Sequence, residues 1–249
     1  MAVFNSFTFD DITSTDYGVY ITGEAVYNAP VRAIEMVTVP GRNGAIAIDQ
    51  GYFENIEVNY PAGVFAANQS GFASKIASLR NALCSKYTYK RLTDTYNPNE
   101  FRMGLYKAGL EVGAVAYHQA GEFIITFDCK PQRWLTSGET PQTFTASGSI
   151  SNPTLFEARP LLEVKGYGAL TLGTDVLTIL NGGSGANQVL YIDCEAQEVW
   201  ALVGGAKVSR NDYVQYSTGD FPVLSAGANT VGLGTGISKV VITPRWWRL

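Results

Sequence analysis

The chain has 249 residues, a formal net charge of −4 at pH 7 and a sequence pI of about 5.1. This charge argues against a protein that binds nucleic-acid phosphates or anionic lipid, because both need a basic surface. Hydrophobic residues make up 46% of the chain and charged residues 16%, which favours a fully folded protein. The length exceeds the usual single domain of about 100 to 200 residues and favours two domains.

The first 58 residues have the pattern of antiparallel strands. Apolar residues recur at every second position, and Gly, Pro and Asn separate the runs. The alternating pairs are Phe7 and Phe9, Val19 and Ile21, Ile34 and Met36, and Ile46 and Ile48. The turn PGRNG, residues 40–44, lies between two of these runs and displays Arg42 and Asn43.

One helix is predicted over residues 68–86, NQSGFASKIASLRNALCSK. Its apolar side chains fall on one face at helical spacing, and they are Phe72, Ile76, Leu79 and Leu83. Asn68 or Ser70 is expected to cap its first turn. Lys86 suits the negative end of the helix dipole.

Further strands are predicted within YTYKRLTDTY, FRMGLYKAGLEVGAVAY and GEFIITFDCKP. In the last of these, Phe123, Ile125 and Phe127 alternate with their neighbours, and Pro131 then ends the strand. Two strand-like flanks around the sequence NPN indicate a hairpin over residues 89–106. We expect this hairpin to be too long to be buried in its own subunit, with an exposed edge that pairs with a neighbour.

The segment LTSGETPQTFTASGSISNPTLFEARP is rich in Ser, Thr, Gly and Pro, and it is the best candidate for a domain boundary. We therefore predict an N-terminal domain over residues 1–134 and a C-terminal domain over 135–249, with a linker at about 135–153. Only strands are expected beyond Leu161. The glycine-rich NGGSGAN, residues 181–187, opens no predicted helix and lacks the Lys-Ser/Thr of a phosphate loop, so we interpret it as a hairpin turn.

Residues that carry chemistry are few. His118 is the only histidine, so a catalytic triad or a histidine-rich metal site would rest on one imidazole, which we interpret as the polar shoulder of a hairpin turn. The cysteines Cys84, Cys129 and Cys194 lie far apart and are expected to be free thiols. We predict no enzyme, no catalytic, cofactor-binding or metal-binding residues, and neither an export signal nor a membrane anchor.

Several segments occur in one order along the whole chain: STDYGVYI, PVRAIEMVTVPGRNG followed by GYFENIEV, the predicted helix, YKRLTDTYNPNEFRMGLY, GEFIITFDCKPQRWL, NPTLFEARPLLEVKGYGALTL, GDFPVLSAGANTVGL and ITPRWWRL. Together they closely resemble the distal tail proteins of phages and prophages with long, non-contractile tails. The resemblance implies a mainly β fold: an N-terminal β-sandwich with one α-helix and a β-hairpin, followed by a C-terminal galectin-like β-sandwich.

The resemblance also implies a function at the virion tail tip, after synthesis in the bacterial cytoplasm. Proteins of this family form a homo-hexameric ring that ends the tail tube. The ring connects the tail tube protein to the tail-associated protein and to receptor-binding or adhesion proteins. DNA passes through such a ring without specific binding, which is compatible with an acidic subunit. A structural hub of this kind needs no catalytic residues.

The PGRNG turn and the predicted hairpin are our candidate subunit contacts. Their residues are Arg42, Asn43, Tyr89, Arg91, Tyr96, Phe101 and Arg102. For Arg42 the alternative is a solvated side chain on an ordinary turn. Two other functions stay open: a carbohydrate-binding module that uses the galectin-like domain, and a cell-wall hydrolase, which rests only on scattered carboxylates.

Overall fold

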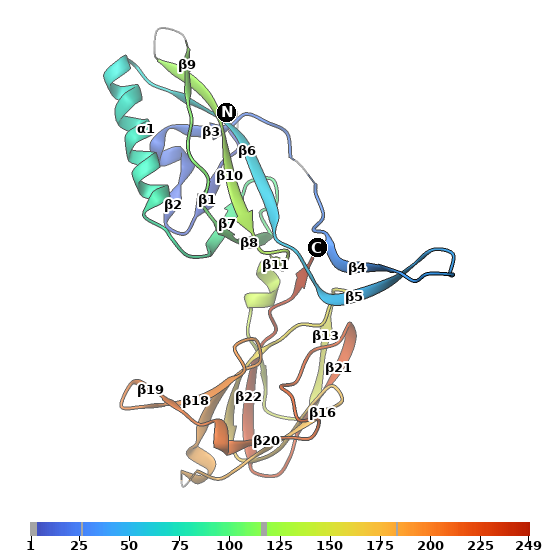
Figure 1. Cartoon of the computed structure of the whole chain (residues 1–249). Helices are drawn as coiled ribbons and strands as arrows, with labels where there is room; N and C mark the ends of the chain where they lie inside the picture. Colours follow the sequence, from blue (N-terminus) through green and yellow to red (C-terminus); the bar gives the residue numbers. More distant parts are fainter. Residues whose placement is uncertain (1–3, 26, 116–118, 183) are drawn as a thin grey trace. The chain divides into compact units, whose positions relative to one another are not determined.

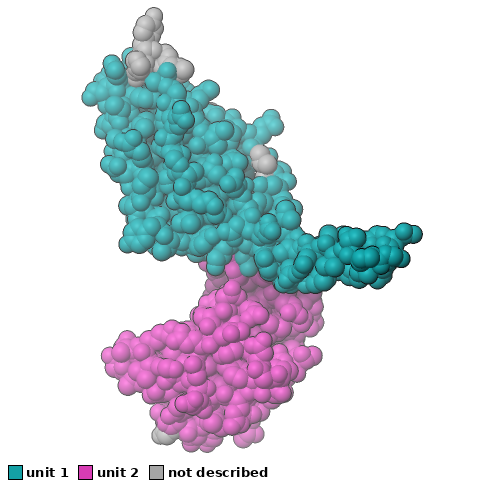
Figure 2. Space-filling model, viewed as in Figure 1, with its two compact units in different colours: residues 1–133, 249 teal, residues 134–248 magenta. Residues whose placement is uncertain are grey.

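A computed structural model describes residues 4–25, 27–115, 119–182 and 184–249. The chain divides into two compact units, Met1–Arg133 and Trp134–Arg248, coloured separately in Figure 2. Both units are built mainly from β-strands, and one α-helix occurs in the described part of the chain. The mainly β fold predicted from the sequence is therefore confirmed.

Unit 1 contains the helix α1 (Gln69–Cys84) and a short 3-10 helix, η1 (Ser14–Tyr17). Its strands, in chain order, are β1 (Phe7–Phe9), β2 (Ile12–Thr13), β3 (Val19–Ile21), β4 (Arg32–Thr38), β5 (Ala45–Phe53), β6 (Ile56–Phe65), β7 (Lys90–Asp94), β8 (Glu100–Leu105), β9 (Gly113–Val115), β10 (Ala120–Cys129) and the start of β11 (Arg133–Leu135). Figure 1 labels most of them.

The main sheet of unit 1 is antiparallel and runs in the order β2-β1-β7-β8-β10-β6-β3, with β9 also paired to β10. β8 and β10 pair only through two residues at their ends, so the sheet folds over at this point. Phe127 of β10 then packs against the opposite half of the sheet, with its ring centroid 4.9 Å from that of Phe9 and 5.5 Å from that of Phe7. The folded sheet thus encloses the core in the manner of a β-sandwich.

Two sequence patterns account for the best-defined elements of unit 1. Phe123, Ile125 and Phe127 are buried along β10, as their alternation predicts. The helix begins as predicted, because the Asn68 side chain accepts a hydrogen bond from the Gly71 amide at 2.8 Å. Figure 1 shows α1 beside the main sheet, and its apolar face joins the core of unit 1.

Unit 2 is a sandwich of two antiparallel sheets, ordered β12-β22-β14-β17-β18-β19 and β13-β21-β15-β16-β20. Its strands are the rest of β11, β12 (Gln142–Phe144), β13 (Gly148–Asn152), β14 (Leu161–Gly166), β15 (Gly168–Leu172), β16 (Asp175–Ile179), β17 (Val189–Asp193), β18 (Glu198–Val203), β19 (Ala206–Ser209), β20 (Val214–Tyr216), β21 (Gly227–Leu233), β22 (Ile237–Thr243) and β23 (Trp247–Arg248). The 3-10 helices η2 (Thr136–Glu139), η3 (Gly185–Asn187) and η4 (Asn211–Tyr213) lie between strands. The inward-facing side chains of both sheets form one core.

Two predictions for this part of the chain need correction. The stretch 135–153 is not a linker, because it carries β12 and β13, which pair with β22 and β21 in the two sheets. The glycine-rich segment 181–187 is not a hairpin turn, because it crosses from β16 in one sheet to β17 in the other. The Gln188 side chain stabilises this crossing by donating to the Leu180 carbonyl at 2.9 Å. Residue 183 lies outside the described residues.

An ion pair inside unit 2 gives the fold a measurable pH dependence. Asp193 accepts hydrogen bonds from Arg245 Nη1 at 2.6 Å and Nη2 at 2.9 Å. Burial raises the pKa of Asp193, but the hydrogen bonds from Arg245 and from the Ala196 amide outweigh it and leave that pKa below its usual value. The pair therefore stabilises the fold above the unfolded carboxyl pKa of about 4, and this contribution is lost as the pH falls through the lower folded pKa.

We accordingly expect Asp193→Asn to lower the free energy of unfolding by about 1 to 3 kcal/mol at pH 7. The difference between variant and parent should shrink as the pH drops below about 4, because the carboxyl is then protonated in the unfolded parent, and it should vanish once the folded carboxylate is protonated too. Urea unfolding at pH 7 and pH 3 measures both values. Asp212→Asn, at an exposed position of the same unit, is the control and should change little at either pH. A pH-independent loss in Asp193→Asn would contradict the electrostatic explanation.

Candidate assembly surface on unit 1

The described residues offer little that could support catalysis. They contain no group of three or more His, Cys, Asp or Glu side chains that could hold a metal ion. Burial raises the pKa of the Cys129 thiol to about 12, and it also raises that of Cys194, so both thiols stay protonated near neutral pH. His118 lies outside the described residues. Within the described part of the chain, no helix is long and apolar enough to cross a membrane.

The most unusual feature of unit 1 is the hairpin of β4 and β5, residues 32–53, which we call the arm. Among the described residues its two strands pair only with each other, and Figures 1 and 2 show the arm projecting from the body of unit 1. Large apolar side chains on it face solvent: Met36 is 63% exposed, Ile34 48% and Ile48 45%. An isolated two-stranded hairpin is marginally stable in water, so such a surface is suited to a partner.

Polar side chains form contacts between the two strands of the arm. Arg32 and Asp49, on opposite strands, form an exposed ion pair, and Arg32 Nε donates to Asp49 Oδ1 at 3.0 Å. The Gln50 side chain donates to Glu35 at 3.2 Å. These charged and amide groups bind one another across the strands, whereas the apolar side chains beside them lack a covering layer. The arm is thus preformed but incompletely buried.

The tip of the arm carries the predicted turn. The Arg42 amide donates to the Val39 carbonyl at 3.2 Å, and Gly41 has a φ of 82°. Proline at the second position and a positive φ at the third make this a type II turn, which explains the Pro-Gly pair. Arg42 and Asn43 are exposed at this tip. The sequence therefore located the turn correctly, and its contact with a neighbour stays a prediction.

The second predicted contact, the hairpin over residues 89–106, is placed differently from our expectation. β7 and β8 lie inside the main sheet, because β1 pairs along β7 and β10 pairs with the end of β8. The hairpin therefore has no free edge along β7, and the prediction of an exposed pairing edge was wrong. Arg102 illustrates the difference, since its side chain is buried rather than displayed.

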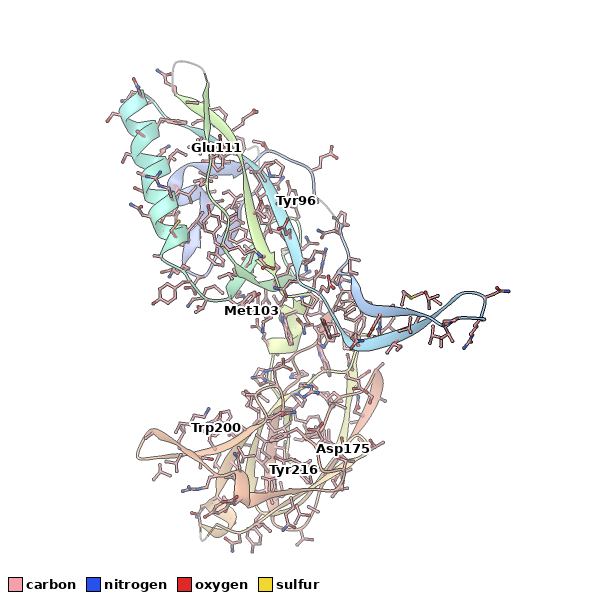
Figure 3. All side chains as sticks on the ribbon, viewed as in Figure 1. Tyr96, Met103, Glu111, Asp175, Trp200 and Tyr216 are labelled. Atoms are coloured by element: carbon pink, nitrogen blue, oxygen red, sulfur yellow. The ribbon has the colours of Figure 1, made fainter. Side chains whose placement is uncertain are left out.

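The other predicted residues of this hairpin are half-buried and engaged within unit 1. Tyr89 OH accepts from the Asn55 side chain at 2.6 Å, and the Arg91 guanidinium lies 3.8 Å from the centroid of the Phe101 ring. Tyr96, labelled in Figure 3, donates its OH to the Gly23 carbonyl. These side chains are partly exposed, so their contact with a neighbouring subunit stays a prediction. They also stabilise the fold of their own unit.

Sequence reasoning missed an apolar patch on the outer face of the main sheet. Phe65 of β6 and Ile124 of β10 are both exposed there. Tyr20 of β3 lies opposite Gly63 of β6 on the same face, and its ring centroid is 4.9 Å from that of the exposed Phe4. The signal was present, because Ile124 occupies an outward position between two buried residues. Outward apolar residues on neighbouring strands indicate a contact surface.

Comparison with solved structures identifies the fold. The SPP1 Dit protein, described as a paradigm of the hub adsorption apparatus in phages that infect Gram-positive hosts, aligns with a TM-score of 0.72 over 98% of this chain and 99% of its own, at 16% identity. Two structures of the phage P2 baseplate in its activated conformation, with Ca and with Sr, cover 96% and 97% of this chain and 98% of their own, at 9% identity and TM-scores of 0.49 and 0.48. These two alignments are too distant to support a fold assignment.

No protein-family model and no curated protein matches the chain. The alignment with the SPP1 Dit protein spans both units, and it confirms the resemblance to distal tail proteins at the level of the fold.

Proposed function

We propose that this chain, which has the fold of the SPP1 Dit protein, is a structural hub protein at the tip of a phage tail. In this proposal six copies form a ring that ends the tail tube. The ring connects the tube protein to the tail-associated protein and to the adhesion proteins that bind the host. The observation that carries the proposal is the alignment with a hub protein along almost the whole chain, rather than along one common domain.

The arm gives the proposal a physical basis. In a closed ring each subunit meets its neighbours through two different surfaces, so a projecting element of one subunit is received by another surface of the next. The arm has exposed apolar side chains on a projecting hairpin, and the patch around Phe65 and Ile124 is a second uncovered apolar surface. We propose that the arm contacts an adjacent subunit and that the patch lies at a tail-protein interface.

The proposed ring is tested by measuring the mass of the assembled protein and by imaging it. Light scattering after size exclusion should give six times the chain mass of 26.9 kDa, and negative-stain images of that peak should show a central hole. A monomer at every concentration, alone and with the tube protein present, would contradict the hexameric ring. If a ring appears only with the tube protein, assembly is templated and the hub function stands.

Arg42 tests the tip of the arm. We expect Arg42→Ala to weaken the ring by about 1.5 to 3 kcal/mol per interface, the usual value of hydrogen bonds to a charged group. Mass photometry during serial dilution measures the concentration at which rings dissociate. Arg80→Ala, which removes an exposed arginine from α1, is the matched control. Equal dissociation of the two variants would show that Arg42 is a solvated turn residue.

Carbohydrate binding by unit 2 is a second candidate. On the outer face of its larger sheet, the rings of Tyr191 and Trp200 stack with centroids 5.5 Å apart, and Lys207 Nζ lies 4.1 Å from the Trp200 centroid. Trp200 is labelled in Figure 3. Aromatic rings beside charged groups suit sugars, although stacking on Tyr191 already uses part of the indole surface. A glycan array with the full chain and with Trp200→Ala tests this candidate, which fails if neither protein binds.

A further inference from the structure

Unit 1 contains a pocket that the hub function does not explain. Its volume is about 130 Å³, enough for a small ligand or several waters, since one water needs roughly 10 to 15 Å³ on the same measure. β6, the β7–β8 hairpin and the segment that leads into the arm contribute its walls. Two arginines, Arg102 and Arg133, are part of the lining.

Arg102 is an unusual residue for such a position. Its side chain belongs to the buried face of β8 and is only 9% exposed. Its Nη1 has no hydrogen-bond partner in the described part of the chain. Burial lowers the pKa of Arg102, and the charge of Arg133 lowers it further. A buried guanidinium that donates to no protein group is costly unless another acceptor is provided.

Arg133 presents a similar problem beside it. It is also 9% exposed, and its Nε lacks a partner among the described residues. Its Nη1 is 3.7 Å from Glu100 Oε2, a charge contact longer than a hydrogen bond. Two like charges thus converge on one pocket, and Arg102 Nη1 and Arg133 Nε have no hydrogen-bond acceptor among the described residues.

The nearest carboxylate of β7 is directed elsewhere. Asp94 accepts hydrogen bonds from Tyr60 OH at 2.8 Å and from the Asn97 backbone amide at 2.9 Å. Its carboxylate therefore binds a buried tyrosine and the turn that follows β7. It offsets part of the charge of Arg102 without a hydrogen bond to it. In the described part of the chain, neither Asp94 nor Glu100 satisfies Arg102 Nη1 or Arg133 Nε, so the pocket has room for a further acceptor.

We propose that this pocket binds a single carboxylate, with Arg102 and Arg133 as its donors. Guanidinium groups bind carboxylates through paired, charge-assisted hydrogen bonds, which suits a small pocket with two arginines. Four carboxylates, Glu24, Glu57, Asp94 and Glu100, also line the pocket and disfavour a ligand with more than one negative charge. The site therefore selects a monoanionic carboxylate over a doubly charged phosphate.

The segment over the pocket links this site to the arm. Tyr96 OH binds the Gly23 carbonyl, and the Asn28 side chain donates to the Glu57 carbonyl at 3.1 Å. Both contacts hold the segment between β3 and β4 against the pocket, and the arm begins directly after it. A carboxylate bound beneath this segment would steady the base of the arm.

Thermal unfolding of the full chain tests binding with acetate as the probe. We expect acetate at about 50 mM to raise the melting temperature by about 5 to 9 °C relative to chloride of equal ionic strength, for a dissociation constant on the order of 1 mM. Phosphate at pH 7.5 should have a smaller effect. Arg102→Met should lose the acetate response, whereas the exposed control Arg80→Met should keep it. Equal responses to acetate and chloride, or an acetate response that persists in Arg102→Met, would overturn the proposal.

Arg102→Lys covers the case in which Arg102→Met does not fold, as judged by circular dichroism. It keeps the charge but loses the planar pair of donors. Saturation-transfer NMR with acetate should therefore give an affinity for acetate that is lower by roughly tenfold or more. An unchanged affinity would count against the proposed donors.

Light scattering distinguishes the source of the carboxylate. If an acidic side chain of a second copy fills the pocket, acetate should lower the mass of the assembled chain and Arg102→Met should lower it too. If the ligand is a free carboxylate, the mass should stay constant while acetate still binds. Acetate binding by a monomer would support the site even if the proposed ring were wrong, so the two proposals fail separately.

Discussion

Replacing Ile34 and Met36 together with glutamate is expected to abolish ring assembly while the chain stays folded. Both side chains lie on one face of the arm and are largely exposed in the single chain, so surface substitutions there should change the free energy of unfolding by only about 0.5 kcal/mol each. In a ring the same positions would be covered, and burying two unpaired carboxylates costs several kcal/mol per interface. Light scattering should give the monomer mass, and calorimetry an unchanged melting profile.

Leu155→Glu is the matched control for this experiment. Leu155 is an exposed apolar residue of unit 2, outside the arm, so the same chemical change there should leave the ring intact. Rings of normal mass in the arm variant would show that the arm does not contribute to assembly. Loss of the ring in both variants would indicate a general effect of added charge instead.

Gly166→Ala is expected to have the largest effect on folding, at about 3 to 5 kcal/mol. Gly166 ends β14 with a φ of 108°, a conformation that favours glycine, and its N–H donates to the Gln188 carbonyl at 2.8 Å. An added Cβ would lie 2.1 Å from the Gly236 carbonyl oxygen, so backbone would have to move. Differential scanning calorimetry should show a weakened or missing transition of unit 2.

Gly204→Ala separates the two causes. Gly204 has a φ of 58°, but an added Cβ there would meet no atom within 4 Å. It should therefore cost only the backbone term, about 1 to 2 kcal/mol. Similar losses at both positions would mean that the close contact with Gly236 relaxes easily.

The elements that could be predicted were those whose signal is local. The alternation of Phe123, Ile125 and Phe127 and the helical spacing from Phe72 to Leu83 each depend on one face being buried, and a face can be read from a short window. The Pro-Gly turn at the tip of the arm was recognisable for the same reason, because its backbone angles require those two residues.

The partner of each strand could not be predicted in this way. Phe7 pairs with Asp94 and Ile150 with Asn229, and no local pattern connects positions so far apart. The hairpin over residues 89–106 was therefore predicted to have a free edge, and β13 was mistaken for a linker because short strands rich in Ser and Gly have the composition of loops.

Exposed apolar faces could not be recognised from the sequence either. In the arm, Ile34 and Met36 alternate with their neighbours as in any strand, and this alternation does not distinguish a face buried in its own subunit from a face that binds a partner. The pocket arginines gave no signal either, since a single charged residue in a strand usually faces solvent.

The pairing order of unit 2 has a consequence during synthesis. β22, near the end of the chain, lies between β12 and β14, and β21 joins β13 to β15. The edge strands β12 and β13 therefore lack their partners until residues 227–243 have left the ribosome, whereas the strands of unit 1 are available much earlier. A ribosome that stalls before residue 227 would hold a folded first unit and a second unit whose strands β12 and β13 are unpaired. We expect such nascent chains to be the ones that chaperones bind and proteases remove.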